Sequence, residues 1–253
     1  MRMPTLFLSH GAPTVVMQQT PAAAFLRSLA AHVPEPKAIL VVSAHWEEAR
    51  PTVGLGVETI HDFFGFPKPM YDLRYPAPLA REVADRAAQL LKPAQVAIDH
   101  ARGRDHGVWT PLMLAWPDAH IPIVQVSLLG GAAPQTHYDI GRALAPLRDE
   151  GVLIIGSGSA THNLRARPTP LPAEWATRFI GWLDATLASG DDAALLDWQR
   201  AAPHAEINHP TPEHFDPIFV ARGATAGEAT ALLHASYEFG SLSMNAYAFG
   251  ALH

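Results

Sequence analysis

Four short apolar runs alternate along the chain with longer segments in which apolar residues return every three or four positions. The runs are rich in Val, Ile and Leu and predict buried strands over residues 5–8, 38–43, 121–127 and 152–156. The longer period predicts helices over 78–91, 136–147 and 175–189. Strands that alternate with helices indicate an α/β fold, layered α/β/α around a largely parallel or mixed central sheet.

Length and composition fit one domain. The chain has 253 residues, of which 48% are hydrophobic and 17% charged, and this is enough apolar material for one sizeable core. No internal repeat or low-complexity tract is present, although the proline-rich stretch 167–172 would suit a boundary between a core and a helical hairpin. We therefore predict a single domain over residues 1–253.

Charge and hydropathy exclude several classes of partner. The 18 basic and 24 acidic residues give a formal net charge of −6 and are scattered, so no basic stripe would follow a nucleic-acid backbone. No uncharged apolar run reaches the length of a membrane span, and the first residues meet a charge and a proline too early for a signal peptide. We expect a cytoplasmic protein with no nucleic-acid or membrane partner.

Histidines are the candidate chemical groups. The chain has 14 histidines and no cysteine, which leaves His, Asp and Glu as its strong metal ligands. His10, His45 and His162 each follow an apolar run, and ligands of parallel sheets gather beyond the carboxyl ends of the strands. The other histidines in polar or turn-like contexts are interpreted as surface residues: His32, His100, His120, His137, His204 and His253.

A fourth candidate ligand, His214, lies in the proline-braced segment HPTPEHF at 209–215. The alternative for this segment is a helix start, with Thr211 as the N-cap and Pro212 as the first helical residue. Both interpretations are compatible, because a ligand in the first turn would be held in a fixed orientation. The residues alone predict a His-rich divalent-metal site, with zinc and non-haem iron both open.

Nine motifs carry a resemblance to a known family. They are SHGAP (9–13), VVSAHW (41–46), TIHDF (59–63), YDLRYPAP (71–78), DHGVWTPL (105–112), IPIVQVSL (121–128), GSGSATHNLR (156–165), HPTPEHF (209–215) and FGSLSMNAYAFG (239–250). The sequence resembles the DODA-type extradiol aromatic ring-opening dioxygenases of the class III, or LigB-like, superfamily. Together and in this order the motifs are highly specific, and they cover nearly the whole chain.

The resemblance implies a LigB-like catalytic domain that inserts both atoms of O2 into a catechol-type substrate, DOPA-like or related. It implies a metal held by His10, His45 and His214, with Glu213 as the competing third ligand. It also implies Fe(II) as the working metal, although zinc is often found in such a site. In the same way it implies His162 as an acid/base residue and His106 as a second catalytic group in the substrate pocket.

Further residues are expected around the substrate. His61, Asp105, Tyr75 and Trp109 are predicted to bind it, and Asp105 is also a candidate for fixing the imidazole tautomer of His106. Arginines whose side chains point into the substrate pocket would bind the side chain of the substrate and so select among catechols. The candidates are Arg74, Arg102, Arg104 and Arg165. We expect a monomer or homodimer. Two alternatives stay open: a zinc-dependent hydrolase on the same site, and a non-enzymatic MEMO-like metal-binding protein.

Overall fold

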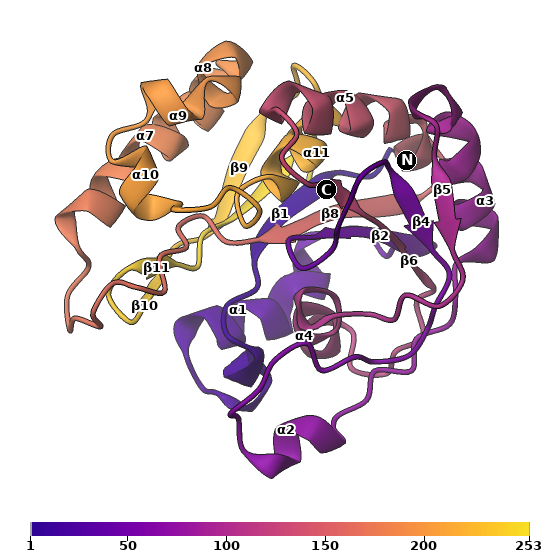
Figure 1. Ribbon diagram of the computed structural model, residues 1–253, viewed down its shortest axis with the longest axis horizontal. Coiled ribbons are helices and arrows are strands. Elements are labelled where there is room, and N and C mark those ends of the chain that lie inside the picture. Colours follow the sequence, from indigo (N-terminus) through magenta and orange to yellow (C-terminus); the bar gives the residue numbers. More distant parts are fainter. Residues whose placement is uncertain (1, 253) are drawn as a thin grey trace.

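An eight-stranded sheet forms the centre of the computed structural model, which describes residues 2–252 (Figure 1). The strand order is β5-β4-β6-β2-β8-β1-β12-β9. The four inner strands are parallel and fully buried, which explains why they stand out in the sequence as continuous apolar runs. They are β6 (Ile123–Val126), β2 (Ala38–Ser43), β8 (Val152–Gly158) and β1 (Thr5–Ser9), and they confirm the four predicted strands with small shifts at the ends.

The outer strands were not predicted from the sequence. On one side, β4 (Thr52–Gly54) runs antiparallel to β6 and parallel to β5 (Ala97–Asp99). On the other side, β12 (Ala246–Phe249) runs antiparallel to β1, and β9 (Thr230–His234) runs antiparallel to β12. Two small ribbons pair β3 (Glu47–Glu48) with β7 (Leu128–Leu129), and β10 (Tyr237–Glu238) with β11 (Leu242–Ser243).

Helices cover both faces of the sheet, which confirms the layered α/β/α class (Figure 1). Alternate residues of β2 point to opposite faces, so Ile39 and Val41 join one apolar cluster while Leu40 and Val42 join the other. The first face carries η1 (Pro13–Met17), α1 (Pro21–Ser28), η2 (Leu29–His32), α2 (Lys68–Asp72) and α4 (His106–Ala115). The second carries α3 (Arg81–Leu90), η3 (Lys92–Ala94), α5 (Pro134–Leu144), α6 (Pro146–Asp149), α7 (Glu174–Ser189) and α11 (Pro217–Gly223).

The three predicted helices correspond to α3, α5 and α7. Pro146 divides the second of them, because its ring cannot continue the helix, and α6 follows as a separate turn. Three short helices follow α7: α8 (Asp192–Leu196), α9 (Trp198–Ala201) and α10 (Ala205–Asn208). They pack with α7 on the apolar cluster that contains Phe7 of β1 and Tyr247 of β12, so the stretch 167–172 does not set them apart from the sheet.

Among residues 2–252, no helix combines the length and the apolar character needed to cross a bilayer. Four of the six histidines interpreted as surface residues are exposed: His32, His100, His120 and His204. The interpretation is wrong for His137, which is fully buried in α5, where its Nε2 accepts the backbone N–H of Leu129 at 3.1 Å. His253 lies outside the described residues.

Candidate active site

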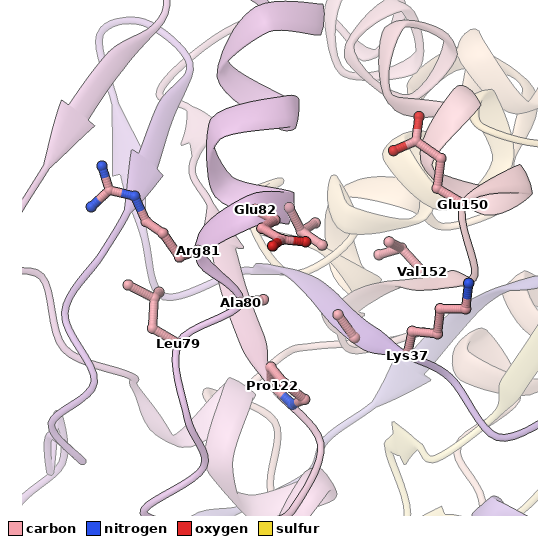
Figure 2. Close-up of a pocket in the computed structure, with 10 residues that line it drawn as sticks. Lys37, Leu79, Ala80, Arg81, Glu82, Pro122, Glu150 and Val152 are labelled. Carbon is pink, nitrogen blue, oxygen red and sulfur yellow. The ribbon is translucent and has the colours of Figure 1, made fainter.

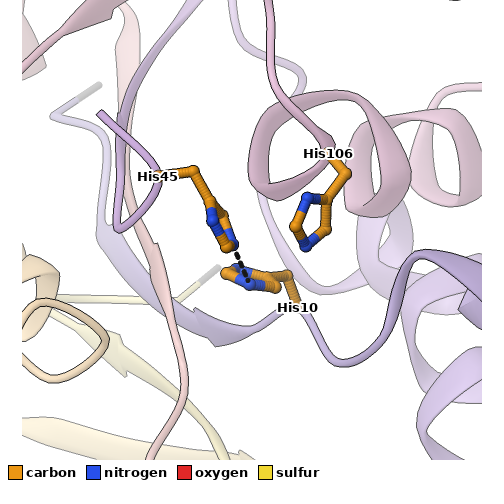
Figure 3. A group of neighbouring side chains, drawn as sticks. All are labelled: His10, His45 and His106. Carbon is orange, nitrogen blue, oxygen red and sulfur yellow. Dashed lines mark hydrogen bonds between the residues drawn. The ribbon is translucent and has the colours of Figure 1, made fainter. Parts of the chain in front are cut away.

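Five histidines meet beyond the carboxyl ends of β1, β2 and β8: His10, His45, His106, His162 and His214. The nitrogen ligand atoms of His10, His45 and His106 all lie within 4.8 Å of one another. Figure 3 shows the three rings turned toward one another. A second group consists of His162, Glu213 and His214, whose ligand atoms also lie within 4.8 Å of one another. The two groups adjoin, because the ring centroid of His214 lies 4.9 Å from that of His45 and 5.6 Å from that of His10.

Glycines of β8 let the His214 segment approach the sheet. A Cβ at Gly158 would overlap the carbonyl oxygen of His214, and a Cβ at Gly156 would overlap that of Pro217. The same carbonyl of His214 accepts the backbone N–H of Ser159 at 2.8 Å, which ties the segment to the end of the strand. The GSGS pattern therefore places His214 beside the two strand-end histidines.

Replacement of Gly158 by alanine is expected to displace His214, because the added methyl group meets backbone and not a flexible side chain. Overpacking of this kind costs about 1–3 kcal/mol, and we expect weaker metal retention as well. Urea unfolding and metal analysis measure the two effects. Gly181→Ala is the matched control, since Gly181 is an exposed residue of α7 and nothing lies within 4 Å of its Cβ position. Unchanged stability and metal content in Gly158→Ala would contradict this account.

The hydrogen bonds of His10 and His214 determine where their ring protons lie. The single hydroxyl proton of Ser157 goes to the carbonyl oxygen of Gly107, so Ser157 Oγ accepts from Nδ1 of His10 at 3.0 Å. Nδ1 of His214 donates in the same way to Oε1 of Glu213 at 2.9 Å. Both rings therefore carry their lone pair on Nε2.

The spacing of the nitrogen atoms fits a divalent metal. Nε2 of His10 and Nε2 of His45 lie 3.1 Å apart, and Figure 3 marks this contact. Two ligands about 2.1 Å from a metal and at right angles to each other lie about 3 Å apart. A cation between the two atoms would satisfy both lone pairs, and a donor set of imidazoles without thiolates suits zinc or Fe(II).

Burial keeps the imidazoles of His10, His45 and His162 neutral. It lowers the pKa of His10 well below its ordinary value, and neighbouring histidines lower it further. Burial, followed by the neighbouring imidazoles, lowers the pKa of His45 to about 2 and that of His162 to about 3. Because only the neutral ring has a free lone pair, the side chains stand ready as ligands or bases near neutral pH.

Asp62, and not Asp105, holds the ring of His106. Its Oδ2 accepts from Nδ1 of His106 at 2.9 Å, and its Oδ1 accepts from the backbone N–H of the same residue at 2.9 Å. Asp105 is fully buried and accepts from Ser43 Oγ at 2.6 Å and from Arg102 at 3.1 Å. The hypothesis that Asp105 fixes this tautomer is therefore wrong, since its carboxylate is engaged elsewhere.

The turn before α11 differs from the predicted helix start. The helix begins at Pro217, and the Thr211 hydroxyl donates to Glu213 Oε1 at 3.1 Å and does not cap a helix. Burial alone would raise the pKa of Glu213, but hydrogen bonds from His214 and Thr211 lower it to about 2. An ionised Glu213 thus orients the His214 ring.

A family model described as the catalytic LigB subunit of aromatic ring-opening dioxygenase matches residues 4–250. The chain belongs to this LigB family. It is an enzyme of the aromatic ring-opening dioxygenase type, and its substrates are an aromatic compound and O2. Of the three functions considered from the sequence, family membership favours the dioxygenase over the zinc hydrolase and the MEMO-like binding protein.

Relatives at high identity cover nearly the whole LigB chain. A protein of Beta vulgaris named 4,5-DOPA dioxygenase extradiol is 43% identical, over 97% of this chain and 96% of its own. A protein of Escherichia coli K12 with the same name is 39% identical, over 96% and 93% of the two chains. The crystal structure of an uncharacterized E. coli K12 protein superposes with a TM-score of 0.84 at 35% identity, covering 98% of this chain and 100% of that one.

Aromatic side chains line up beside His106 in the LigB site. The Phe63 ring centroid lies 5.9 Å from that of His106 and 6.3 Å from that of Trp109. His61 lies 5.6 Å from Phe63 and 5.8 Å from Trp109, while Tyr71 lies 5.3 Å from Phe63. Trp109 is fully buried and donates to the carbonyl of Ile60, so it backs this wall and does not form its exposed surface.

Other predicted pocket residues have supporting roles. The Tyr75 hydroxyl donates to the carbonyl of Trp116 at 2.8 Å inside the core, and Asp105 has no exposed surface, so both side chains are engaged within the protein. Arg102 donates to Asp105 and to the carbonyl oxygen of His45. Buried Arg104 donates to the carbonyl oxygens of Ala77 and Pro78. Arg74 and Arg165 are exposed, and both remain candidates for binding the side chain of the substrate.

A cavity of about 560 Å³ lies at the opposite edge of the sheet (Figure 2). Its lining includes Lys37, Pro122 and Val152, which stand at the amino ends of β2, β6 and β8. Ligands of such sheets bind beyond the carboxyl ends, where the histidines are. We therefore place the active site at the histidine cluster.

Proposed function

We propose that this LigB protein is an extradiol dioxygenase that opens the ring of a DOPA-like catechol with Fe(II) held by His10, His45 and His214. The main support is that Nε2 of His10 and Nε2 of His45 lie 3.1 Å apart, with the ring centroid of His214 5.6 Å and 4.9 Å from those two rings. Hydrogen bonds to Ser157 and Glu213 hold the rings of His10 and His214 with the lone pair on Nε2. The relatives named 4,5-DOPA dioxygenase extradiol support the choice of substrate class. Bound Fe(II) would supply a centre to which catecholate and O2 both bind, and would lower the pKa of the catechol hydroxyl.

His162 is proposed as the base that takes the catechol proton. Its ring lies parallel to that of His214, with centroids 3.5 Å apart and an angle of 8° between the planes. Within residues 2–252 no hydrogen bond engages its ring nitrogens, so a neutral ring nitrogen is free for a substrate hydroxyl. The protonated ring would then be available to return the proton when the oxygen–oxygen bond breaks.

His106 is proposed as the second acid/base group. Asp62 occupies its Nδ1, and the other ring nitrogen points toward His10, as Figure 3 shows. A group at this place would hydrogen-bond the substrate's second oxygen. Phe63 and His61 form the adjoining wall for a flat ring, with Trp109 behind them.

The assay that tests the proposal compares metals and substrates. Protein loaded anaerobically with Fe(II) is expected to consume one O2 per catechol cleaved and to form a yellow ring-opened product, with DOPA, caffeate, protocatechuate and catechol as the panel. The zinc-loaded protein is the control and should consume no oxygen. Ester or amide cleavage by the zinc form, without oxygen uptake by the iron form on any catechol, would overturn the assignment.

A further inference from the structure

One carboxylate contacts two of the five site histidines. Asp62 lies in the loop between β4 and α2, and its side chain is only 18% exposed although the residue's backbone is open to solvent. Its Oδ2 lies 2.9 Å from Nδ1 of His106 and 3.6 Å from Nδ1 of His45. Its Oδ1 accepts the backbone N–H of His106, the first residue of α4.

We propose that Asp62 is a positioning residue that holds His106 and His45 in the tautomer with the proton on Nδ1, so that both Nε2 lone pairs face the site. The reaction role of His106 rests on the proposed function, but the tautomer and its effect on metal binding do not. Asp105, the carboxylate next to His106 in the sequence, does not bond to the ring, since it bonds to Ser43 and Arg102.

The proton positions follow from the donor and acceptor inventory. An ionised carboxylate only accepts, so the hydrogen bond at 2.9 Å requires the proton on Nδ1 of His106. For His45 the contact at 3.6 Å is longer than a hydrogen bond, and the negative charge attracts the Nδ1–H through space. Nε2 of His45 then faces Nε2 of His10, as a shared metal requires.

The substitution Asp62→Asn separates this role from a structural one. The amide oxygen can take the place of Oδ1 and still accept the backbone N–H that begins α4. The amide nitrogen then takes the place of Oδ2 and donates to Nδ1 of His106, which forces the ring proton onto Nε2. The helix cap is kept while the tautomer is reversed. Asp62→Ala removes both contacts, and exposed Asp118→Asn is the matched control.

The decisive measurement is the imidazole 15N NMR spectrum of zinc-loaded, histidine-labelled protein, with the His106 signals assigned by their loss in His106→Asn. We expect Nδ1–H in the wild type and in Asp118→Asn, and Nε2–H in Asp62→Asn. Zinc affinity, measured by chelator competition, should fall about 10–100-fold in both Asp62 variants, the usual range for loss of a group that orients a ligand. In the iron form, kcat should fall more than KM rises.

Two results would overturn the proposal. One is a wild-type spectrum with the His106 proton on Nε2, which needs no variant to fold. The other is Asp62→Asn with unchanged tautomer and zinc affinity but reduced stability, which would leave Asp62 as a helix cap alone. Absence of oxygen uptake by the wild type would refute the dioxygenase proposal without touching the NMR and zinc results, so the two failures are distinguishable.

Discussion

Replacement of His214 by alanine is expected to abolish metal retention. The hydrogen bond from its Nδ1 to Glu213 orients Nε2 as a donor, and its ring lies 4.9 Å and 5.6 Å, between centroids, from His45 and His10. Loss of one of three ligands should weaken binding by more than the roughly 10–100-fold effect of removing an orienting group. Metal analysis after dialysis against a mild chelator measures this loss, and exposed His120→Ala is the control.

Metal retention measured in Glu213→Gln and in His106→Ala determines which residue is the third metal ligand beside His10 and His45. Glu213 is the rival named from the sequence, but its Oε1 already accepts from His214 and Thr211. His106 is a rival that the structure adds, because its ring nitrogen lies within 4.8 Å of those of His10 and His45. Metal retention by His214→Ala with loss in Glu213→Gln or in His106→Ala would move the ligand assignment to that residue.

The sequence predicted the part of the fold on which the site is built. The four inner strands are buried on both faces, so each is a continuous apolar run that needs no partner to be recognised. Among the outer strands, β4 and β5 have only three residues each, and β12 is defined by pairing with β1, more than two hundred residues away in the chain. No local period marks such a strand, since long-range pairing determines where it forms.

Site residues could be predicted from the sequence where a neighbouring strand places them, and not where a contact joins residues far apart in the chain. Histidines directly after β1 and β2 were recognised from their position, because the strand itself places them at the edge of the sheet. Asp62 meets His106 across 44 residues, and the adjacent Asp105 was the more obvious partner from the sequence. Thr211 fits the N-cap pattern, yet a hydrogen bond to Glu213 competes with capping.

His162→Ala is expected to retain metal and to lose turnover by roughly two to four orders of magnitude, the range for loss of a general base. The ring stacks on His214 at 3.5 Å, so it reaches the metal's surroundings, but no hydrogen bond orients it as a ligand among the described residues. Metal content, anaerobic catechol binding and kcat separate the possible roles. We expect normal metal content, nearly normal binding and a large fall in kcat.

A second variant distinguishes base catalysis from packing. His162→Gln keeps a polar side chain of similar length beside His214 but has no basic nitrogen, so its kcat should fall as far as that of the alanine variant. Recovery of kcat in His162→Gln would show that packing against His214 matters and proton transfer does not. If kcat falls less than tenfold in both variants, the role of general base would be assigned to His106, whose Nε2 points toward His10 in Figure 3. Loss of metal in either variant would instead make His162 a ligand, since its ring nitrogen lies within 4.8 Å of the ligand atoms of Glu213 and His214.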